Sequence, residues 1–247
     1  MALTRITLQE VDNYIEAINR AEDLDQIFSI LQKQINVLGF EKMTYWLRWH
    51  RKDTRRPVLI SSYPEKFLDH YADQNFQNHD MVGKYSNLKN TPFTWSDIYK
   101  NFEVTKVQKI LFQDSSSVGL RSGGSIPIHG PGLVKATFSV ANDEKDTTFD
   151  RLFSYRRHEL QIIATYAHEK IMSLGLDSPM IDNILTPKEI DILSWVAAGK
   201  SYWEIGVIHK IQEDTVKKHM QSIFHKLGVT NKSHAVSKAI IHGIIFP

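Results

Sequence analysis

Cysteine is absent from the 247 residues, and so are long apolar runs. Without cysteine the chain has no disulfide, no thiolate metal ligand and no cysteine nucleophile, and this usage suits a reducing compartment. The longest apolar stretches are far shorter than the roughly 20 residues of a membrane-spanning helix, and the N-terminus shows no basic segment before an apolar run. The sequence therefore predicts a cytoplasmic protein with no membrane contact.

Motifs typical of enzymes and of metal sites are also missing. The chain has 11 histidines, but none occurs in an HExxH motif or in another spacing of metal ligands. There is no glycine-rich loop for phosphate and no Gly-x-Ser-x-Gly elbow. We therefore expect no catalytic activity, no metal and no cofactor.

Arginine is missing from residues 186–247, where lysine alone supplies the cationic side chains. This segment has eight lysines and five acidic residues, whereas the first 185 residues hold 22 basic and 23 acidic side chains. A net charge of +2 for the whole chain argues against a protein that coats nucleic acid non-specifically. The small positive excess lies at the C-terminal end.

Residues 1–174 combine helical and strand-like patterns. Apolar residues at helical spacing predict helices at residues 24–38, 64–71 and 149–174. Alternating aromatic and β-branched residues predict strands at residues 43–49, 58–61, 124–129 and 133–141. Short turns separate the strands of each pair, so hairpins are expected. The pattern predicts an α+β domain, an α/β/α sandwich around an antiparallel sheet, followed by a linker at residues 175–184.

Residues 185–247 carry explicit helix-start signals and predict an all-α domain of four helices. Thr186 and Glu189 have the spacing of a capping box, as have Ser201 and Glu204. A third helix is expected to begin near residue 212 or 213, and a fourth near Asn231. Two short capped helices joined by a tight turn are typical of a helix-turn-helix, which presents its second helix to the major groove of DNA.

The third of these helices has two distinct faces. Its apolar face is formed by Val216, Met220, Ile223 and Leu227, and Lys217, Lys218 and Gln221 lie on the opposite side. A lysine face opposite an apolar stripe is also typical of an ordinary solvated helix, so periodicity alone leaves DNA binding open. Gly206, in the preceding helix, is expected where the paired helices cross closely.

The segments Leu185–Glu189, Trp195–Lys200, Glu204–Ile205, Thr215–His219 and Lys226–Val229 resemble the LuxR-type DNA-binding domain. This resemblance covers some 60 residues and implies a homodimer that binds a palindromic operator in duplex DNA. It implies groove-facing positions for Lys217 and Gln221, and nearby base or phosphate contacts for Lys218 and Thr215. Gln212 replaces the usual serine cap of the recognition helix, and the loss of a serine cap lowers helix stability by about 1 kcal/mol.

The N-terminal half resembles the autoinducer-binding domain of quorum-sensing LuxR-type regulators. The matching positions are Tyr63, Phe67, Tyr71, Asp80, Trp95, Gly119–Gly123 and Ile126–Ile128. No receiver pattern of paired acids and a phosphoacceptor aspartate is present. The resemblance implies a ligand-responsive transcriptional regulator that senses an acyl-homoserine lactone or a related acyl or aryl signal.

Such a ligand has an amide N–H, two carbonyls and an apolar tail, so its pocket needs an acceptor, several donors and an aromatic wall. Asp80 is the expected acceptor. Tyr63 and Ser139 are the expected donors to the acyl carbonyl, and Thr137 competes for that role because it shares a strand face with Ser139. The wall is expected from Tyr71, Trp95, Val82 and Ile110. An aromatic stripe is also typical of an ordinary core, and a lone aspartate of a helix cap.

Two departures from the family pattern concern the head group of the ligand. Phe67 replaces a tryptophan whose indole N–H donates to the lactone carbonyl in the family, and phenylalanine cannot donate. Met81 replaces the common proline after the aspartate. These departures favour a different acyl or aryl signal, or an altered pose of the ligand. A separate alternative is a ligand-independent dimeric transcription factor whose N-terminal domain serves dimerisation or binds a protein partner.

Overall fold

The computed structural model describes residues 5–48, 57–130, 134–175 and 185–246. The chain divides into two compact units, one largely before residue 176 and one after it. The helices of the first unit are α1 (Leu8–Arg20), α2 (Leu24–Leu38), α3 (Glu65–Asp73), the 3-10 helix η1 (Phe76–Asn78), α4 (Met81–Ser86), α5 (Trp95–Asn101), α6 (Lys106–Ser117) and α7 (Asp146–Ser173). Its strands are β1 (Lys42–Arg48), β2 (Val58–Ser61), β3 (Phe93–Thr94), β4 (Ser122–His129) and β5 (Lys135–Asn142).

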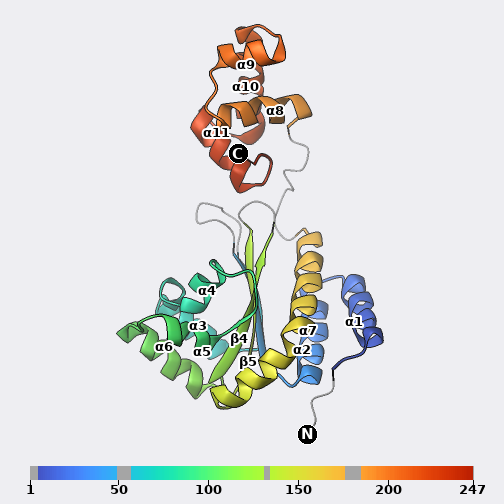
Figure 1. The fold of residues 1–247 in the computed structure, drawn as a ribbon, viewed down its shortest axis with the longest axis vertical. Coiled ribbons are helices and arrows are strands. Elements are labelled where there is room, and N and C mark those ends of the chain that lie inside the picture. The colour runs from blue at the N-terminus through green and yellow to red at the C-terminus, as the bar shows by residue number, and fades with distance from the viewer. Residues whose placement is uncertain (1–4, 49–56, 131–133, 176–184, 247) are drawn as a thin grey trace. The chain divides into compact units, whose positions relative to one another are not determined.

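Within the described ranges these strands form one antiparallel sheet in the order β2-β1-β5-β4-β3. Tyr45 lies opposite Phe138 of β5, which in turn lies opposite Ile126 of β4. Residues paired in register point to the same face of a sheet, and these three side chains are fully buried. Helices α2 and α7 cover this face (Figure 1).

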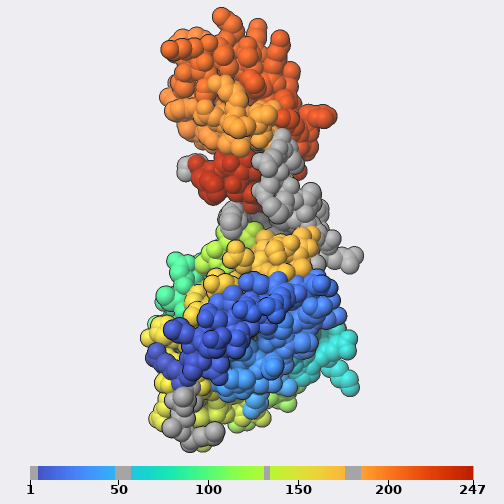
Figure 2. Space-filling model, turned by 90° about the vertical axis from the view of Figure 1, so that its right-hand side faces the viewer, coloured from blue at the N-terminus to red at the C-terminus, as the bar shows by residue number. Residues whose placement is uncertain are grey.

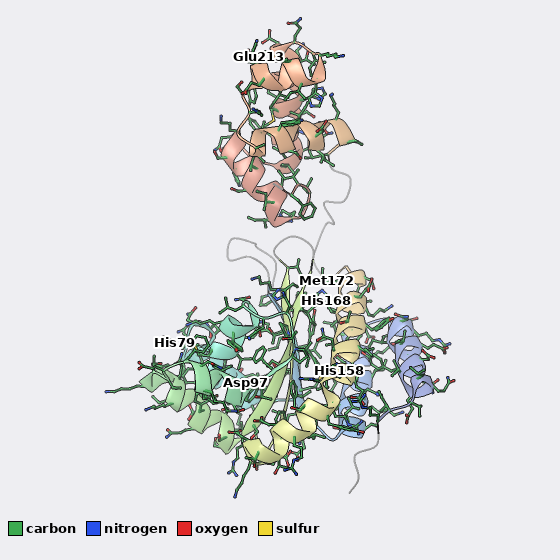
Figure 3. The ribbon with its side chains drawn as sticks, in the orientation of Figure 1. His79, Asp97, His158, His168, Met172 and Glu213 are labelled. Carbon is green, nitrogen blue, oxygen red and sulfur yellow. The ribbon has the colours of Figure 1, made fainter. Side chains whose placement is uncertain are left out.

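Helix α7 packs directly on the sheet. A Cβ atom added to Gly124 would lie 2.3 Å from the Phe153 ring, so β4 needs glycine where this ring contacts its backbone. His168 of α7 (Figure 3) lies 2.7 Å from the Tyr45 hydroxyl, and burial lowers the pKa of His168 to about 4. Helix α1 joins this layer because the Tyr14 hydroxyl donates to a carbonyl of α7, and α1 and α2 form the blue face in Figure 2.

Helices α3 to α6 cover the opposite face of the sheet (Figure 1). The predicted α/β/α sandwich around an antiparallel sheet is confirmed, and α2, α3 and α7 occur where helices were expected. The predicted turn residues 51–56 and 131–132 and the predicted linker residues 176–184 lie outside the described residues. No helix in the part of the chain that the structure covers is long and apolar enough to cross a membrane.

The second unit is the expected all-α domain. Its helices, among the described residues, are α8 (Pro187–Ala197), α9 (Tyr202–His209), α10 (Glu213–Leu227) and α11 (Lys232–Ile241). Both predicted capping boxes form, at Thr186 and at Ser201, and Asn231 caps α11. The predicted apolar face of α10 is confirmed as core, because Val216, Met220, Ile223 and Leu227 are all buried.

Gly206 lies where α9 meets the turn and the start of α10. A Cβ atom at this position would lie 2.8 Å from the carbonyl oxygen of Ile211 and 3.5 Å from the amide nitrogen of Glu213, so the closest contact is with the turn and the next is with the first residue of α10. The Ile211 amide of this turn donates a hydrogen bond of 2.9 Å to the Gly206 carbonyl. Lys210 adopts the left-handed conformation there, with φ of 53°. These contacts fix the turn that joins α9 to α10.

Candidate functional site

A cavity lies between the sheet and the helices α3 to α6 of the first unit. Its wall combines aromatic and aliphatic side chains with a few hydroxyls and one carboxylate. The lining residues are Thr44, Trp46, Tyr63, Phe67, Tyr71, Asp80, Val82, Gly83, Trp95, Leu111, Phe112, Ser115, Leu120, Thr137 and Ser139.

All seven residues expected to bind a ligand line this one cavity. They come from segments far apart in the sequence: Tyr63, Phe67, Tyr71, Asp80, Trp95, Thr137 and Ser139. Val82 also lines it as expected, but Ile110 does not. Ile110 is 48% exposed on α6, and the adjacent Leu111 is 7% exposed and faces the cavity. The expectation for Ile110 was wrong by one residue, because the phase of α6 was not known.

Asp80 lies at the start of α4 and has two roles. Its Oδ1 accepts a hydrogen bond of 2.7 Å from the Val82 amide, so it caps the helix. Its Oδ2 accepts a hydrogen bond of 2.9 Å from the Tyr71 hydroxyl. These two bonds hold the carboxylate at the cavity wall, so the helix cap and the cavity acceptor are the same group.

Two buried hydroxyl groups of the cavity wall come from β5 and from the segment between β2 and α3. Tyr63 Oη and Thr137 Oγ1 are buried and have no hydrogen-bond partner among the residues that the structure describes. Burial, followed by the nearby charge of Asp80, raises the pKa of Tyr63, so its phenol remains protonated and able to donate. An unpaired buried hydroxyl costs about 1–3 kcal/mol, so an acceptor atom inside the cavity would relieve this cost.

Trp95 forms one end of the cavity and directs its indole N–H away from it. The Nε1–H donates to Ser125 Oγ over 3.1 Å, and Ser125 Oγ lies 2.8 Å from Ser139 Oγ. A Cβ atom on Gly123 would lie 2.5 Å from the indole ring. The absence of a side chain at position 123 therefore allows the indole to pack against β4.

Phe67 lies in an aromatic cluster on α3. Its ring centroid is 6.4 Å from that of Tyr63 and 6.3 Å from that of Tyr71, and its side chain is buried. This part of the wall supplies apolar contact and ring edges, but the Phe67 side chain donates no hydrogen bond.

Nearly half of the lining residues were not assigned to the cavity from the sequence. Thr44 and Trp46 were placed in a strand but not assigned to a face, although their spacing of two puts both on the face of Ser139 and Thr137. The lining residues of α6 were missed because that helix was not predicted. Its signal is the capping box formed by Thr105 and Gln108.

In the second unit, the polar residues of α10 expected to face DNA are accessible. Lys217, Lys218 and Gln221 are exposed, and Thr215 is half-buried. Lys217 Nζ forms ion pairs with Glu213 at 3.0 Å and Asp214 at 3.2 Å (Glu213 is labelled in Figure 3). Hydrogen bonds from Lys217, first to Glu213 and then to Asp214, raise its pKa. The sequence analysis overlooked these pairs, which the spacing of three and four residues indicates.

Glu189 connects α8 to α10 inside the second unit. Its carboxylate accepts hydrogen bonds of 2.7 Å each from the Thr186 amide, the Ser222 hydroxyl and Lys226 Nζ. Burial opposes ionisation, but the bonds from Lys226, Thr186 and Ser222 outweigh it and lower the pKa of Glu189 to about 2. The structural role expected for this residue has a clear physical basis, since one buried anion holds the helix-turn-helix to the helix before it.

A cavity with hydrogen-bonding groups in one unit and a helix-turn-helix in the other are the features of a ligand-binding transcriptional regulator. Residues 23–171 match the autoinducer binding domain family, and residues 183–239 match the luxR family of bacterial regulatory proteins. The chain therefore belongs to the LuxR family of quorum-sensing transcriptional regulators, with an autoinducer-binding domain and a DNA-binding domain.

Relatives cover nearly the whole chain. The transcriptional activator protein LuxR of Aliivibrio fischeri is 28% identical over 94% of this chain and 92% of its own. The putative HTH-type transcriptional regulator y4qH of Sinorhizobium fredii is 33% identical over 95% of this chain and 74% of its own.

Solved structures share the fold. Escherichia coli SdiA matches with a TM-score of 0.77 at 22% identity, over 97% of this chain and 99% of SdiA. A second SdiA structure, in complex with octanoyl-rac-glycerol, matches with a TM-score of 0.75 at 21% identity, over 96% of this chain and 97% of SdiA. The relatives are transcriptional regulators and not enzymes.

Proposed function

We propose that the cavity binds an acyl-homoserine lactone or a related small acyl or aryl signal. The ligand-binding residues of this proposal are Tyr63, Phe67, Tyr71, Asp80, Trp95, Thr137 and Ser139. The observation that carries it is the composition of the cavity wall, in which one carboxylate and several hydroxyls stand among aromatic and aliphatic side chains. A ligand with one amide and an apolar tail has the matching chemistry.

In this proposal the amide group of the signal forms hydrogen bonds with opposite sides of the cavity. Asp80 accepts its N–H in a charge-assisted hydrogen bond. Tyr63 and Ser139 donate to the acyl carbonyl, and Thr137 donates to the same oxygen or to a neighbouring one. The acyl tail packs against the apolar part of the wall, which includes Leu111.

The proposed contacts specify the head group of the signal less closely than its amide and its acyl tail. Phe67 leaves a lactone carbonyl without the indole donor that the family resemblance implies. SdiA is recorded in complex with octanoyl-rac-glycerol, an acyl compound without a lactone ring. The proposed class therefore includes acyl compounds that make no hydrogen bond at the position of Phe67.

A thermal-shift titration of the purified full-length protein with N-acyl-homoserine lactones of four to fourteen acyl carbons tests this proposal. A ligand at 100 times its Kd stabilises the folded state by about 2.7 kcal/mol, which raises Tm of the sensor domain by about 5 to 10 °C. The Phe67→Trp variant adds an indole donor and is expected to increase the shift with lactones and not with acylglycerols.

If neither lactones nor acylglycerols of any chain length shift Tm, the proposed ligand class is wrong. The alternative, a ligand-independent dimeric factor, then predicts that the protein purified without ligand binds its operator with full affinity. It also predicts that substitutions in the cavity wall leave DNA affinity unchanged.

We further propose that the protein acts in the cytoplasm as a homodimer on a palindromic operator in duplex DNA. Residues 1–174 form the sensor domain, 175–184 the linker and 185–247 the DNA-binding domain. Each DNA-binding domain places α10 in a major groove, and the contacts come from Thr215, Lys217, Lys218 and Gln221. The exposure of three of these four side chains supports this assignment.

Lys217→Ala and Gln221→Ala are each expected to weaken operator binding about 10- to 100-fold, because a specific base contact is worth about 1–3 kcal/mol. Lys217→Ala has the larger expected effect, since it removes a positive charge beside the DNA phosphates as well as a groove contact, whereas Gln221 is neutral. Fluorescence anisotropy with an operator duplex measures both changes. Lys33→Ala, an exposed lysine of α2, is the control. Retention of full operator affinity by both α10 variants would refute the groove assignment.

A further inference from the structure

A row of hydroxyl residues crosses the sheet beneath the cavity. Ser125 of β4 lies opposite Ser139 of β5, and Ser139 lies opposite Thr44 of β1. Residues paired in register share a face, and Ser139 and Thr44 both line the cavity. Ser125 has no exposed surface and lies behind Ser139, between it and the indole of Trp95.

The hydrogen bonds of Ser125 define a direction. An indole N–H can only donate, so Trp95 Nε1 donates to Ser125 Oγ over 3.1 Å. Between Ser125 Oγ and Ser139 Oγ, which are 2.8 Å apart, either oxygen can supply the hydrogen. If Ser139 supplied it, Ser125 would accept twice, and its own hydrogen would have no recorded acceptor among the described residues in a fully buried place. An unpaired buried donor is costly, so the favoured direction runs from Trp95 to Ser125 to Ser139.

This direction determines whether the Ser139 hydroxyl can donate a hydrogen bond into the cavity. Because its oxygen accepts from Ser125, its hydrogen is left to point toward the cavity as a donor. The bond from Trp95 also polarises Ser125 and strengthens the bond that follows. Gly123 supports the arrangement, since any side chain there would displace the indole. Thr137 Oγ1, a buried hydroxyl with no hydrogen-bond partner among the described residues, adds a second donor on the same face of β5.

We infer that Ser125, which does not touch the cavity, is a positioning residue that sets Ser139 as a hydrogen-bond donor, so that the sheet wall selects a signal presenting an acceptor oxygen to it. The cavity is then polarised, with donors along the sheet and the acceptor Asp80 at the start of α4. The inference rests on the proposed ligand-binding function. It disfavours signals that present only a hydrocarbon surface to Ser139, because the Ser139 hydrogen would then have no acceptor.

A double-mutant cycle on the full-length protein tests the inference, with the N-acyl-homoserine lactone that binds the wild type most tightly as the probe. Ser139→Ala is expected to raise Kd about tenfold, and Ser125→Ala about three- to fivefold, because the Ser139 hydroxyl is then free to turn. The double variant is expected to bind no more weakly than Ser139→Ala. Ser125→Thr retains a hydroxyl and is expected to restore most of the affinity.

Ser86→Ala is the matched control, because Ser86 is a buried serine that does not line the cavity and has no recorded hydroxyl partner in the described ranges. Its Kd is expected to equal that of the wild type. An unchanged Kd in Ser125→Ala, or losses that add fully in the double variant, would overturn the inference.

A ligand-free measurement separates this inference from the proposed function. The indole N–H resonance of Trp95, assigned by its loss in Trp95→Phe, is expected to shift in Ser125→Ala and, by a smaller amount, in Ser139→Ala. If Ser125→Ala leaves this resonance unmoved, the hydrogen-bond chain does not exist and the inference is wrong. If both shifts occur and no lactone binds the wild type, the ligand class is wrong while the control of Ser139 by Ser125 stands.

Discussion

The Asp80→Asn variant is expected to bind the signal about 10- to 100-fold more weakly than the wild type, while the fold is retained. A hydrogen bond to a charged group contributes about 1.5–3 kcal/mol, and the asparagine amide presents either a weaker acceptor or a donor that opposes the N–H of the signal. Asparagine and aspartate are similar N-caps, so the bond from the Val82 amide that starts α4 is kept. Isothermal titration with the same lactone or acylglycerol measures the change in Kd.

Asp23→Asn is the control for Asp80→Asn. Asp23 caps α2 through a hydrogen bond of 2.8 Å from the Gln26 amide, and it does not line the cavity. The same chemical change is therefore made at a helix cap with no ligand role, and the affinity for the signal is expected to stay unchanged. Equal affinities of Asp80→Asn and the wild type would show that Asp80 serves only as a cap.

Glu189→Gln is expected to destabilise the second unit by about 2–4 kcal/mol, because it removes the anion that pairs with Lys226 and accepts from Ser222 and Thr186. Hydrogen exchange of the amides in α8 and α10 of the full-length protein measures this change in the correct unit. Glu204→Gln is the matched control. Glu204 holds the same capping-box position in α9, but its side chain is 40% exposed, so a smaller loss is expected.

The stability of the second unit is also expected to depend on pH through Glu189. Its pKa in the folded protein is about 2, compared with the ordinary value of 4.5. Because the folded-state pKa is lowered, the stabilisation is fully present above pH 4.5 and is lost as the pH falls from there toward 2. Glu189→Gln is expected to lack this part of the acid sensitivity. An identical acid profile in the variant and the wild type would contradict this assignment.

The helices and the turn of the DNA-binding unit could almost all be predicted from the sequence. Its helix starts are set by local chemistry, as at Thr186 and Ser201, where each cap and its partner lie three residues apart. The turn was placed correctly as well, although the contact between Gly206 and the Ile211 carbonyl depends on three-dimensional geometry. Local signals of this kind need no knowledge of distant packing.

The sensor unit was less predictable. Helix α4 has six residues, and a helix this short is stabilised by its tertiary contacts more than by its own sequence. Ser125 was not assigned a role, because the register that brings it opposite Ser139 is set by the pairing of strands and not by either strand alone. The residues proposed to bind the ligand were therefore found through the family resemblance, whereas the assignment of Ser125 required the structure.

The ion pairs of Lys217 with Glu213 and Asp214 have a consequence for the salt dependence of DNA binding. When a lysine approaches DNA it displaces a condensed cation from the phosphates, and this release makes binding weaker at high salt. In the proposed operator complex, Lys217 leaves two carboxylates behind, and these take up cations from solution as it does so. This uptake of cations by the carboxylates offsets part of the cation release from the phosphates. Lys217 therefore contributes less than Lys218 to the salt dependence of DNA binding. Its part in operator binding is therefore retained better as ionic strength rises.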